Sequence, residues 1–322
     1  ASPQAPPLDS RVRLRSIAAA LQDIPPLSPA WRQLVEFTAQ YYQRSAGEVA
    51  LAALPSQLRE LTGEQWARRL KKYQRTDTVA SSATAPSPLV SLTPEQQEVL
   101  TRMAHGEGPF LLYGNTGSGK TEVYLRAAES VLERDPQAQI LVMVPEINLT
   151  PQLEERFRAR FCPQWGADCL VAMHSSLTPA QRLKNWLAAH NGEARIVLGT
   201  RMAVFASMPH LQLIVVDEEH DPSYKQQEGA RYSARDLAVY RGQLEGAQVI
   251  LGSATPSLES WHHSRPATAT EPAGRYLRLA MPSRVGQGAL PQVRRVDMNR
   301  QPYKTVFSSH LLQAMRERVT RG

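Results

Sequence analysis

The sequence predicts an α/β protein built on a parallel β-sheet, and three features of the chain lead to this fold class. Short aliphatic and β-branched runs alternate with amphipathic stretches from residue 91 onward. A glycine-rich turn joins the first of these runs to a helical stretch within Phe110–Leu125. A later run, Leu213–Val216, ends in three acids and a histidine. We therefore expect strands buried on both faces, with crossover helices between them.

The N-terminal part of the chain is expected to form short helices. Apolar residues follow helical spacing over Arg11–Leu21 and Pro29–Tyr42, and again over Gly47–Leu58 until Pro55 interrupts the pattern. The prolines of Ile24–Pro29 separate the first two helices. We therefore expect residues 1–58 to be a small helical segment in front of the sheet.

A basic run and a linker are expected next, over residues 59–90. The run Arg68–Lys72 fits either a solvated helix face or a contact with phosphate, and the sequence does not decide between them. Thr76–Pro88 has few large apolar residues and many Ser, Ala, Thr and Pro, so burial cannot repay the entropy of ordering it. We expect a flexible linker here and a second domain over residues 91–322.

The second domain is expected to contain a parallel sheet. Its predicted strands are Phe110–Tyr113, Ile140–Val144, Leu170–Met173, Ile196–Gly199, Leu213–Val216 and Val249–Gly252. Amphipathic stretches such as Pro151–Phe161 and Pro179–His190 are the expected crossover helices. Beyond Ser260 we expect irregular chain, and then a final helix, Ser309–Arg318, that packs on the sheet through Leu311, Leu312 and Met315.

Composition limits the partners and the compartment. The 322 residues include 37 Lys and Arg against 30 Asp and Glu, a net charge of +7 that favours an anionic partner, with nucleic acid the leading candidate. The spacing of Cys162 and Cys169 fits neither a disulfide framework nor a metal half-site, which favours a reducing compartment. No apolar run approaches the length of about 20 residues that a membrane span needs. We therefore expect a cytoplasmic protein with no membrane partner.

The glycine-rich turn has the pattern G-x-x-x-x-G-K-T of a phosphate-binding loop. Its residues are Gly114, Asn115, Thr116, Gly117, Ser118, Gly119, Lys120 and Thr121. The glycines let successive backbone N–H groups face an anion, and the helix that begins at Lys120 adds its positive end. Lys120 is placed to reach the β- and γ-phosphates, and the Thr121 hydroxyl to ligate Mg²⁺. We therefore expect ATP and Mg²⁺ to bind here.

The acidic cluster LIVVDEEH is the expected Walker B partner of that loop. Asp217 is expected to hold Mg²⁺, and Glu218 to orient and deprotonate the attacking water. Glu219 receives no role from the sequence. His220 fits either a link between the nucleotide site and a neighbouring motif or a polar residue at a helix start. We expect the link, with Ser253 and Thr255 of Leu251–Ser257 as its partners.

Other strand ends and a helix start complete the predicted site. Thr200 and Arg201 follow one strand and Thr150 follows another, where each is placed to meet a sugar-phosphate backbone. Upstream, Thr93 is an expected helix cap, and Gln96 has an amide that can pair with the edge of adenine.

Aromatic and basic residues interleave over Tyr224–Arg241. The tyrosines are Tyr224, Tyr232 and Tyr240, and the cations are Lys225, Arg231, Arg235 and Arg241. Stacking faces that alternate with cations suit single-stranded nucleic acid, which presents bases and phosphates together. The alternative is a surface helix whose tyrosine rings pack inward. From this segment we expect Tyr224, Lys225, Arg231, Tyr232 and Arg235 to bind DNA.

Taken in order, these motifs closely resemble one family, the PriA replication-restart helicases of bacteria. The resemblance rests on GNTGSGKTEVYL, VPEINLTPQ, GTR, DEEHDPSYKQQEGARYSARDLAVYR and GSATPSLES. It covers Ser91–Gly322 strongly, and more loosely Leu14–Arg59, which is similar to the end of the family's domain that binds the DNA 3′ end.

The resemblance implies a RecA-like first motor lobe of an ATP-dependent 3′ to 5′ DNA helicase, in a chain truncated at both ends. It implies single-stranded and forked DNA, single-strand-binding protein and primosome proteins as partners, and a loop at 224–235 that couples DNA contact to ATP hydrolysis. Zinc is expected only in the family's cysteine-rich C-terminal region, which this sequence lacks. Because the second lobe would bring an arginine finger, we expect slow hydrolysis by this chain alone.

Two other functions fit part of the sequence. One is an ATP-binding regulator or assembly module that does not translocate, and the other is a DExH-type RNA helicase. The dependence of activity on DNA separates the first from a DNA helicase. The aromatic and basic segment argues against the second.

Overall fold

The computed structural model describes residues 24–60, 62, 64–66, 68, 90–285, 293–302 and 304–321. The chain divides into two compact units, Ala1–Val285 and Gly286–Gly322. The expected helix over Arg11–Leu21, most of the basic run Arg68–Lys72 and the expected linker lie outside the described residues.

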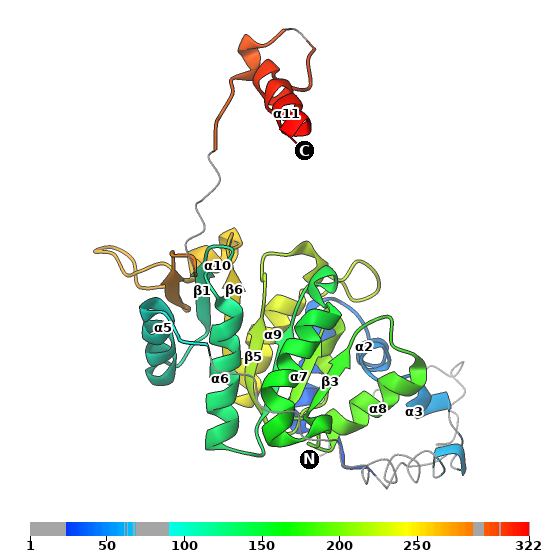
Figure 1. Cartoon of the computed structure of the whole chain (residues 1–322). Helices are drawn as coiled ribbons and strands as arrows, with labels where there is room; N and C mark the ends of the chain where they lie inside the picture. Colours follow the sequence, from blue (N-terminus) through cyan, green and yellow to red (C-terminus); the bar gives the residue numbers. More distant parts are fainter. Residues whose placement is uncertain are drawn as a thin grey trace. The chain divides into compact units, whose positions relative to one another are not determined.

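The described residues form one seven-stranded sheet in which every pair of neighbours is parallel (Figure 1). Its strands are β1 (Phe110–Gly114), β2 (Gln139–Met143), β3 (Leu170–Met173), β4 (Ile196–Gly199), β5 (Leu211–Val216), β6 (Gln248–Ser253) and β7 (Leu277–Met281). They lie in the order β3-β4-β2-β5-β6-β1-β7. The predicted α/β fold class and parallel sheet are confirmed.

Strand β7 corrects the prediction of irregular chain after Ser260. It pairs with β1 in parallel, with Leu279 opposite Leu112. As an edge strand it buries only Leu279 and Met281 fully, while Leu277 and Ala280 are exposed. Such a short half-buried run gives a weaker signal than the continuous apolar runs of the central strands.

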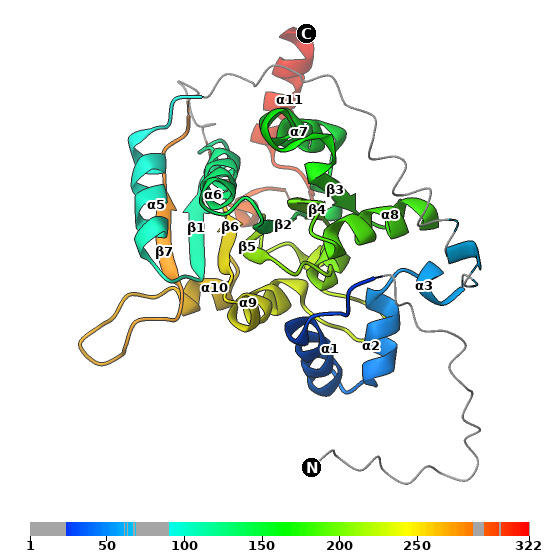
Figure 2. The same ribbon diagram turned by 90° about the horizontal axis from the view of Figure 1, so that it is seen from below.

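Two hydrophobic layers cover the sheet because successive side chains of each strand point to opposite faces. Phe110 and Leu112 of β1 join one core cluster, and Leu111 joins the other. Helices α5 (Pro94–His105), α6 (Lys120–Arg134) and α7 (Pro151–Trp165) lie on the first face, while α9 (Ala234–Glu245) lies on the second (Figure 2). Helix α8 (Pro179–His190) packs beside β3. The expected crossover helices therefore cover the sheet.

The N-terminal helices belong to the same compact unit as the sheet. They are α1 (Pro29–Tyr41), α2 (Ala46–Ala53) and α3 (Gln57–Glu60). The side chain of Trp31 is 3% exposed, and its indole Nε1 donates to the Phe205 carbonyl oxygen at 2.7 Å. Phe37 stacks on Tyr240 of α9 with 3.9 Å between ring centroids. The segment expected as a separate domain over residues 1–58 thus shares a core with the α9 face, as Figure 2 shows.

Short elements complete the described chain. They are helix α10 (Leu258–His263) and the 3₁₀ turns η1 (Glu146–Asn148), η2 (Ala167–Cys169), η3 (Arg201–Phe205), η4 (Pro222–Tyr224) and η5 (Met298–Arg300). Helix α11 (Ser309–Arg321) belongs to the second unit, where Leu311, Leu312 and Met315 are exposed, so their packing on the sheet stays a prediction. None of the described helices has both the length and the apolar character of a bilayer span.

Candidate nucleotide site

The predicted site residues gather at one edge of the sheet because the carboxyl ends of parallel strands meet there. Strands β1, β5 and β6 lie side by side in the order β5-β6-β1. The phosphate loop leaves β1, Asp217 follows β5, and Ser253 ends β6. Three motifs that are far apart in sequence are therefore brought together, at the crevice where open α/β sheets bind ligands.

The phosphate loop requires glycine at two positions. Gly117 and Gly119 have φ angles of 84° and 83°, in the left-handed region that glycine adopts without strain. A β-carbon on Gly119 would also lie 2.3 Å from Nε2 of Gln96, so a side chain there would displace the Gln96 amide. The backbone of Gly117, by contrast, faces open space apart from Arg284. Gln96 therefore lies directly against the loop at Gly119.

Lys120 lies at the start of α6 and points back across the loop. It is 8% exposed, and its Nζ donates to the Gly114 carbonyl oxygen at 2.9 Å. The ammonium group therefore lies at the mouth of a turn whose N–H groups and helix end favour an anion. The residues present fit a nucleotide phosphate.

Gln96 supports the phosphate loop directly. Its Oε1 accepts from the Thr93 backbone N–H at 2.9 Å, which completes the capping box of α5. Its Nε2 lies 3.4 Å from the carbonyl oxygens of both Ser118 and Gly119. Because the amide is 3% exposed and already paired at both ends, contact with adenine would require it to exchange partners. The adenine contact stays a prediction.

Asp217 and Glu218 follow β5 with different surroundings. Asp217 Oδ1 accepts from the Tyr124 hydroxyl at 2.9 Å. Burial raises the pKa of the Asp217 carboxyl, the Tyr124 hydrogen bond opposes this, and the negative charge of Glu218 adds to it. Glu218 is more open and has a φ of 45°, a left-handed conformation that is rare for a residue with a side chain and that occurs at active sites. Asp217 is thus a carboxylate held in place by a hydrogen bond, which fits a metal ligand. Glu218 is a more accessible carboxylate, which fits a general base.

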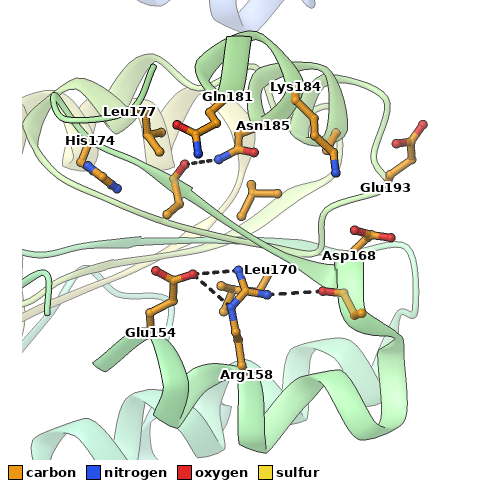
Figure 3. Close-up of a pocket in the computed structure, with 14 residues that line it drawn as sticks. Glu154, Arg158, Asp168, Leu170, His174, Leu177, Gln181, Lys184, Asn185 and Glu193 are labelled. Atoms are coloured by element: carbon orange, nitrogen blue, oxygen red, sulfur yellow. Dashed lines mark hydrogen bonds and ion pairs between the residues drawn. The ribbon is translucent and has the colours of Figure 1, made fainter. Parts of the chain in front are cut away.

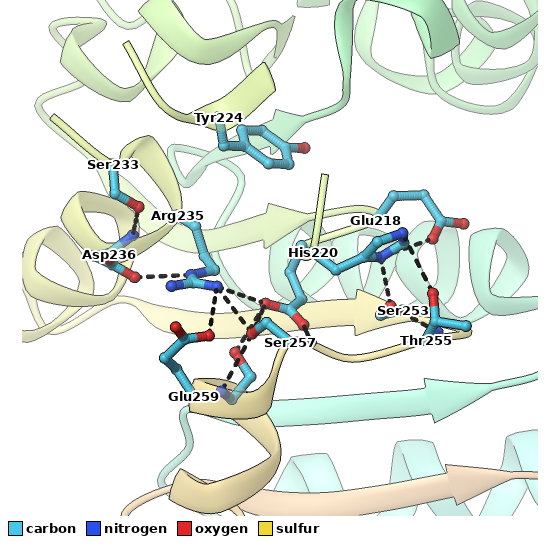
Figure 4. A network of polar contacts seen from close by, with 12 residues as sticks. Glu218, His220, Tyr224, Ser233, Arg235, Asp236, Ser253, Thr255, Ser257 and Glu259 are labelled. Atoms are coloured by element: carbon cyan, nitrogen blue, oxygen red, sulfur yellow. Dashed lines mark hydrogen bonds and ion pairs between the residues drawn. The ribbon is translucent and has the colours of Figure 1, made fainter. Parts of the chain in front are cut away.

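The predicted link between motifs is present as contacts (Figure 4). His220 Nδ1 lies 2.8 Å from Ser253 Oγ, and His220 Nε2 lies 3.3 Å from Thr255 Oγ1. His220 also lies 3.6 Å from Glu218 Oε2. One imidazole therefore joins the end of β5 to the end of β6. That it transmits a signal between them stays a prediction.

Glu219 is the site residue that sequence reasoning missed. Its side chain is fully buried and accepts from the Ser257 backbone N–H at 2.7 Å and from the Ser257 and Ser260 hydroxyls at 2.9 and 2.8 Å. Arg235 Nη1 lies 3.4 Å from Glu219 Oε2. The third acid thus anchors α10 and the start of α9 to the Walker B turn. No sequence signal identified it, because its donors Ser257 and Ser260 lie 38 and 41 residues further along the chain.

Tyr224 and Tyr232 were expected to stack on bases, but both rings are buried in this structure, and their contact with DNA stays a prediction. Tyr224 is 2% exposed, and its hydroxyl donates to the Asp217 carbonyl oxygen at 2.7 Å. Tyr232 is also buried, with its ring edge against Phe205 at 5.1 Å between centroids. Neither ring presents a face to solvent. The alternative, in which the tyrosine rings pack inward, describes these two tyrosines. It also describes Tyr240 of α9, whose ring packs against Phe37 of α1.

Three of the basic side chains are also engaged within the protein. Arg201 Nη1 donates to the Ser223 carbonyl oxygen at 2.7 Å. Arg235 pairs with Asp236 at 2.8 Å as well as with Glu219, and Arg241, at 1% exposure, pairs with Glu245 at 2.7 Å. These guanidinium groups hold the segment in place, and the DNA contacts expected of Arg201 and Arg235 stay predictions.

Other predicted DNA contacts remain accessible. Lys225 and Arg231 are exposed, and Lys225 lies over the Tyr42 ring at 5.2 Å. Thr150 is exposed at the N-terminus of α7, where its hydroxyl accepts from Leu153 N–H at 3.3 Å. Thr200, however, is buried. Among the cations predicted to bind DNA, Lys225 and Arg231 are therefore the ones exposed to solvent.

Two hollows flank these elements. One, of about 260 Å³, lies over the Walker B turn between Glu219, Tyr224 and Arg235. The other, of about 350 Å³, lies along β3 between α7 and α8, with Arg158, Lys184 and Glu193 among its lining residues (Figure 3). None of the predicted site residues lines the second hollow, so it lies outside the nucleotide site.

Comparisons with known proteins agree with this site. The profile of the DEAD/DEAH box helicase family matches residues 93–263, and that of the PriA 3′ DNA-binding domain matches residues 2–55. The replication restart protein PriA of Bacillus subtilis is 41% identical over 66% of this chain and 25% of its own length. That of Treponema pallidum is 35% identical over 88% of this chain and 39% of its own. This chain therefore spans well under half the length of these relatives.

Solved helicase structures align more distantly. MrfA, a DUF1998 helicase bound to DNA, aligns at a TM-score of 0.43 and 17% identity, over 67% of this chain and 27% of that one. Helicase Lhr of Mycobacterium smegmatis, bound to single-stranded DNA and AMP-PNP, aligns at 0.43 and 19% identity, over 70% and 28%. The DEAD/DEAH box helicase profile covers more than half of this chain, and the relatives compared above are PriA proteins. The chain therefore belongs to the DEAD/DEAH box helicase family and resembles its PriA branch, as predicted.

Proposed function

We propose that this chain is the first motor lobe of an ATP-dependent 3′ to 5′ DNA helicase that acts in replication restart at stalled forks and D-loops. The observation that carries this proposal is the hydrogen bond from Tyr224 to the Asp217 carbonyl oxygen, at 2.7 Å. It joins the segment expected near DNA to the residue expected to hold Mg²⁺. A motor must couple these two sites, and this contact is a physical connection between them.

Each residue at the sheet edge has a definite task in this proposal. The loop N–H groups and Lys120 bind the phosphates, and Thr121 and Asp217 would hold Mg²⁺. When bound, Mg²⁺ supplies positive charge that offsets the charge developing on the phosphoryl group. Glu218, accessible beside Asp217, accepts a proton from the attacking water. His220 holds Glu218 and Ser253 in a common arrangement.

The wider role rests on the PriA relatives. We propose single-stranded and forked DNA as ligands, single-strand-binding protein and primosome proteins as partners, and the cytoplasm as the location. Zinc, on this proposal, is held by the cysteine-rich C-terminal region of the family. Hydrolysis by this chain alone is expected to be slow, because the arginine finger of such motors comes from a second lobe.

The test is ATP binding and hydrolysis by the purified chain with no nucleic acid, with single-stranded DNA and with single-stranded RNA. Lys120→Ala should weaken ATP binding about 10- to 100-fold, because a charge-assisted hydrogen bond is worth about 1.5–3 kcal/mol. Lys184→Ala, an exposed lysine on α8, is the matched control and should bind ATP normally. DNA should raise ATP turnover or affinity more than RNA does. Nucleotide binding that ignores both nucleic acids would favour the regulator, and a larger response to RNA would favour the RNA helicase.

A further inference from the structure

Tyr124 is a buried polar residue to which the sequence motifs assign no role. It follows Lys120 by four residues on α6, so both side chains lie on the same face of that helix. Only 2% of Tyr124 is exposed. A phenol in such a place needs a hydrogen-bond partner, because burying an unpaired hydroxyl is costly.

The partner of Tyr124 is the Asp217 carboxylate. The Tyr124 hydroxyl lies 2.9 Å from Asp217 Oδ1. An ionised carboxylate can only accept, so the phenol donates. This contact holds one oxygen of the carboxylate, Oδ1, in place.

The neighbouring strand is shaped to admit the phenol. A β-carbon on Gly252 of β6 would lie 1.6 Å from the Tyr124 hydroxyl oxygen, so only glycine leaves space for it. The Gly252 carbonyl oxygen also accepts from the Glu219 backbone N–H at 3.0 Å, which fixes the turn that follows Asp217. The helix of the phosphate loop, the Walker B turn and the strand of the SAT motif thus meet at one hydroxyl.

We propose that Tyr124 is a positioning residue that orients the Asp217 carboxylate toward the Mg²⁺ of bound ATP. The inference rests on the proposed function, since it concerns the same metal. Hydrogen-bond partners of metal-holding carboxylates fix their orientation, and their loss typically costs about 10- to 100-fold in metal affinity or activity. Tyr124 acts only through Asp217 and does not touch the nucleotide.

The test is Tyr124→Phe, with ATP affinity measured by calorimetry across a Mg²⁺ series and in EDTA. This change keeps the ring and removes only the donor. We expect the Mg²⁺ concentration for half-maximal ATP binding to rise about tenfold, with affinity in EDTA changed by less than about twofold. Tyr42→Phe is the matched control, because the Tyr42 hydroxyl is also hydrogen-bonded, to Ser233 N–H at 3.0 Å, but lies away from Asp217. It should leave the Mg²⁺ dependence unchanged.

Two results would overturn the inference. One is a wild-type Mg²⁺ dependence in Tyr124→Phe, and the other is an equal loss of affinity with Mg²⁺ and in EDTA, which would mark a purely structural role. Failure of the proposed function looks different. In that case Mg²⁺ would leave ATP binding by the wild-type chain unchanged, and Asp217→Asn would behave as wild type.

Discussion

The phosphate loop and the segment Tyr224–Arg241 were both predicted from residue patterns, but the two predictions agree with the structure to different degrees. In the phosphate loop, Gly117, Gly119 and Lys120 take the backbone and side-chain positions that their motif implies. In the other segment, Tyr224 and Tyr232 are buried and Arg235 is paired within the protein, while Lys225 and Arg231 are exposed.

The difference lies in what each pattern constrains. The phosphate-loop motif fixes backbone conformation, because only glycine fits its turns and a helix must follow. An alternation of tyrosines and arginines does not determine the backbone conformation. Tyrosine serves equally as a surface platform or as a core ring with a paired hydroxyl, and arginine serves as a DNA contact or as an internal clamp. The segment thus consists of a structural frame, made of Tyr224, Tyr232, Arg235 and Arg241, and two exposed cations.

The largest expected effect on stability is that of Glu219→Ala, which removes the buried partner of Arg235 in the frame. Glu219→Ala should lower the free energy of unfolding by about 3–5 kcal/mol, because it leaves Arg235 without its fully buried partner and two serine hydroxyls without their acceptor. Glu259 is the matched control, since it pairs with the same Arg235 Nη1, at 3.9 Å, but is 69% exposed. Glu259→Ala should cost less than about 0.5 kcal/mol in urea-induced unfolding. Equal losses for the two variants would show that Glu219 anchors nothing.

A smaller effect is expected for Tyr224→Phe. This change keeps the buried ring and removes the hydroxyl that donates to the Asp217 carbonyl oxygen. The buried carbonyl oxygen then loses its donor, so stability should fall by about 1–3 kcal/mol. Tyr41 is 67% exposed, and Tyr41→Phe should change stability by less than about 0.5 kcal/mol in the same unfolding experiment. If Tyr224→Phe is equally silent, the Tyr224 hydroxyl contributes nothing to the frame.

The smallest effect on the fold is expected from the exposed cations. Arg231→Ala and Lys225→Ala should each leave the unfolding free energy within about 1 kcal/mol of wild type. Each should reduce the slope of log affinity for single-stranded DNA against log salt by about 0.7, because one phosphate contact is lost. Lys184→Ala, remote from this edge, should leave the slope unchanged. Slopes that stay at the wild-type value in all three variants would remove Lys225 and Arg231 from the DNA contact.

Much of the sheet was predictable from sequence, because its central strands are continuous apolar runs buried on both faces. The order of motifs along those strands also placed Asp217, His220 and Ser253 at one edge. Strand β7 was not predictable in this way, since only alternate residues of an edge strand are buried. The docking of α1 was missed because the indole of Trp31 meets a carbonyl oxygen 174 residues away.

Within the site, roles that depend on tertiary partners escaped prediction. Glu219 stands between Glu218 and His220 and looks no different from them in sequence, yet three donors from later in the chain surround it. Tyr124 reads as an ordinary core residue of α6 until the space above Gly252 is known. Such residues are identified by what surrounds them and not by their spacing.

The central claim is that the buried frame, through Tyr224, joins DNA contact to the nucleotide site. Its most direct test is the affinity for single-stranded DNA, measured with and without a non-hydrolysable ATP analogue and Mg²⁺, in wild type and in Tyr224→Phe. Coupling between two ligands is reciprocal and typically amounts to about 5- to 150-fold in affinity. We predict such a change of DNA affinity by nucleotide in wild type and a ratio near one in Tyr224→Phe. The same ratio in both proteins would contradict the claim.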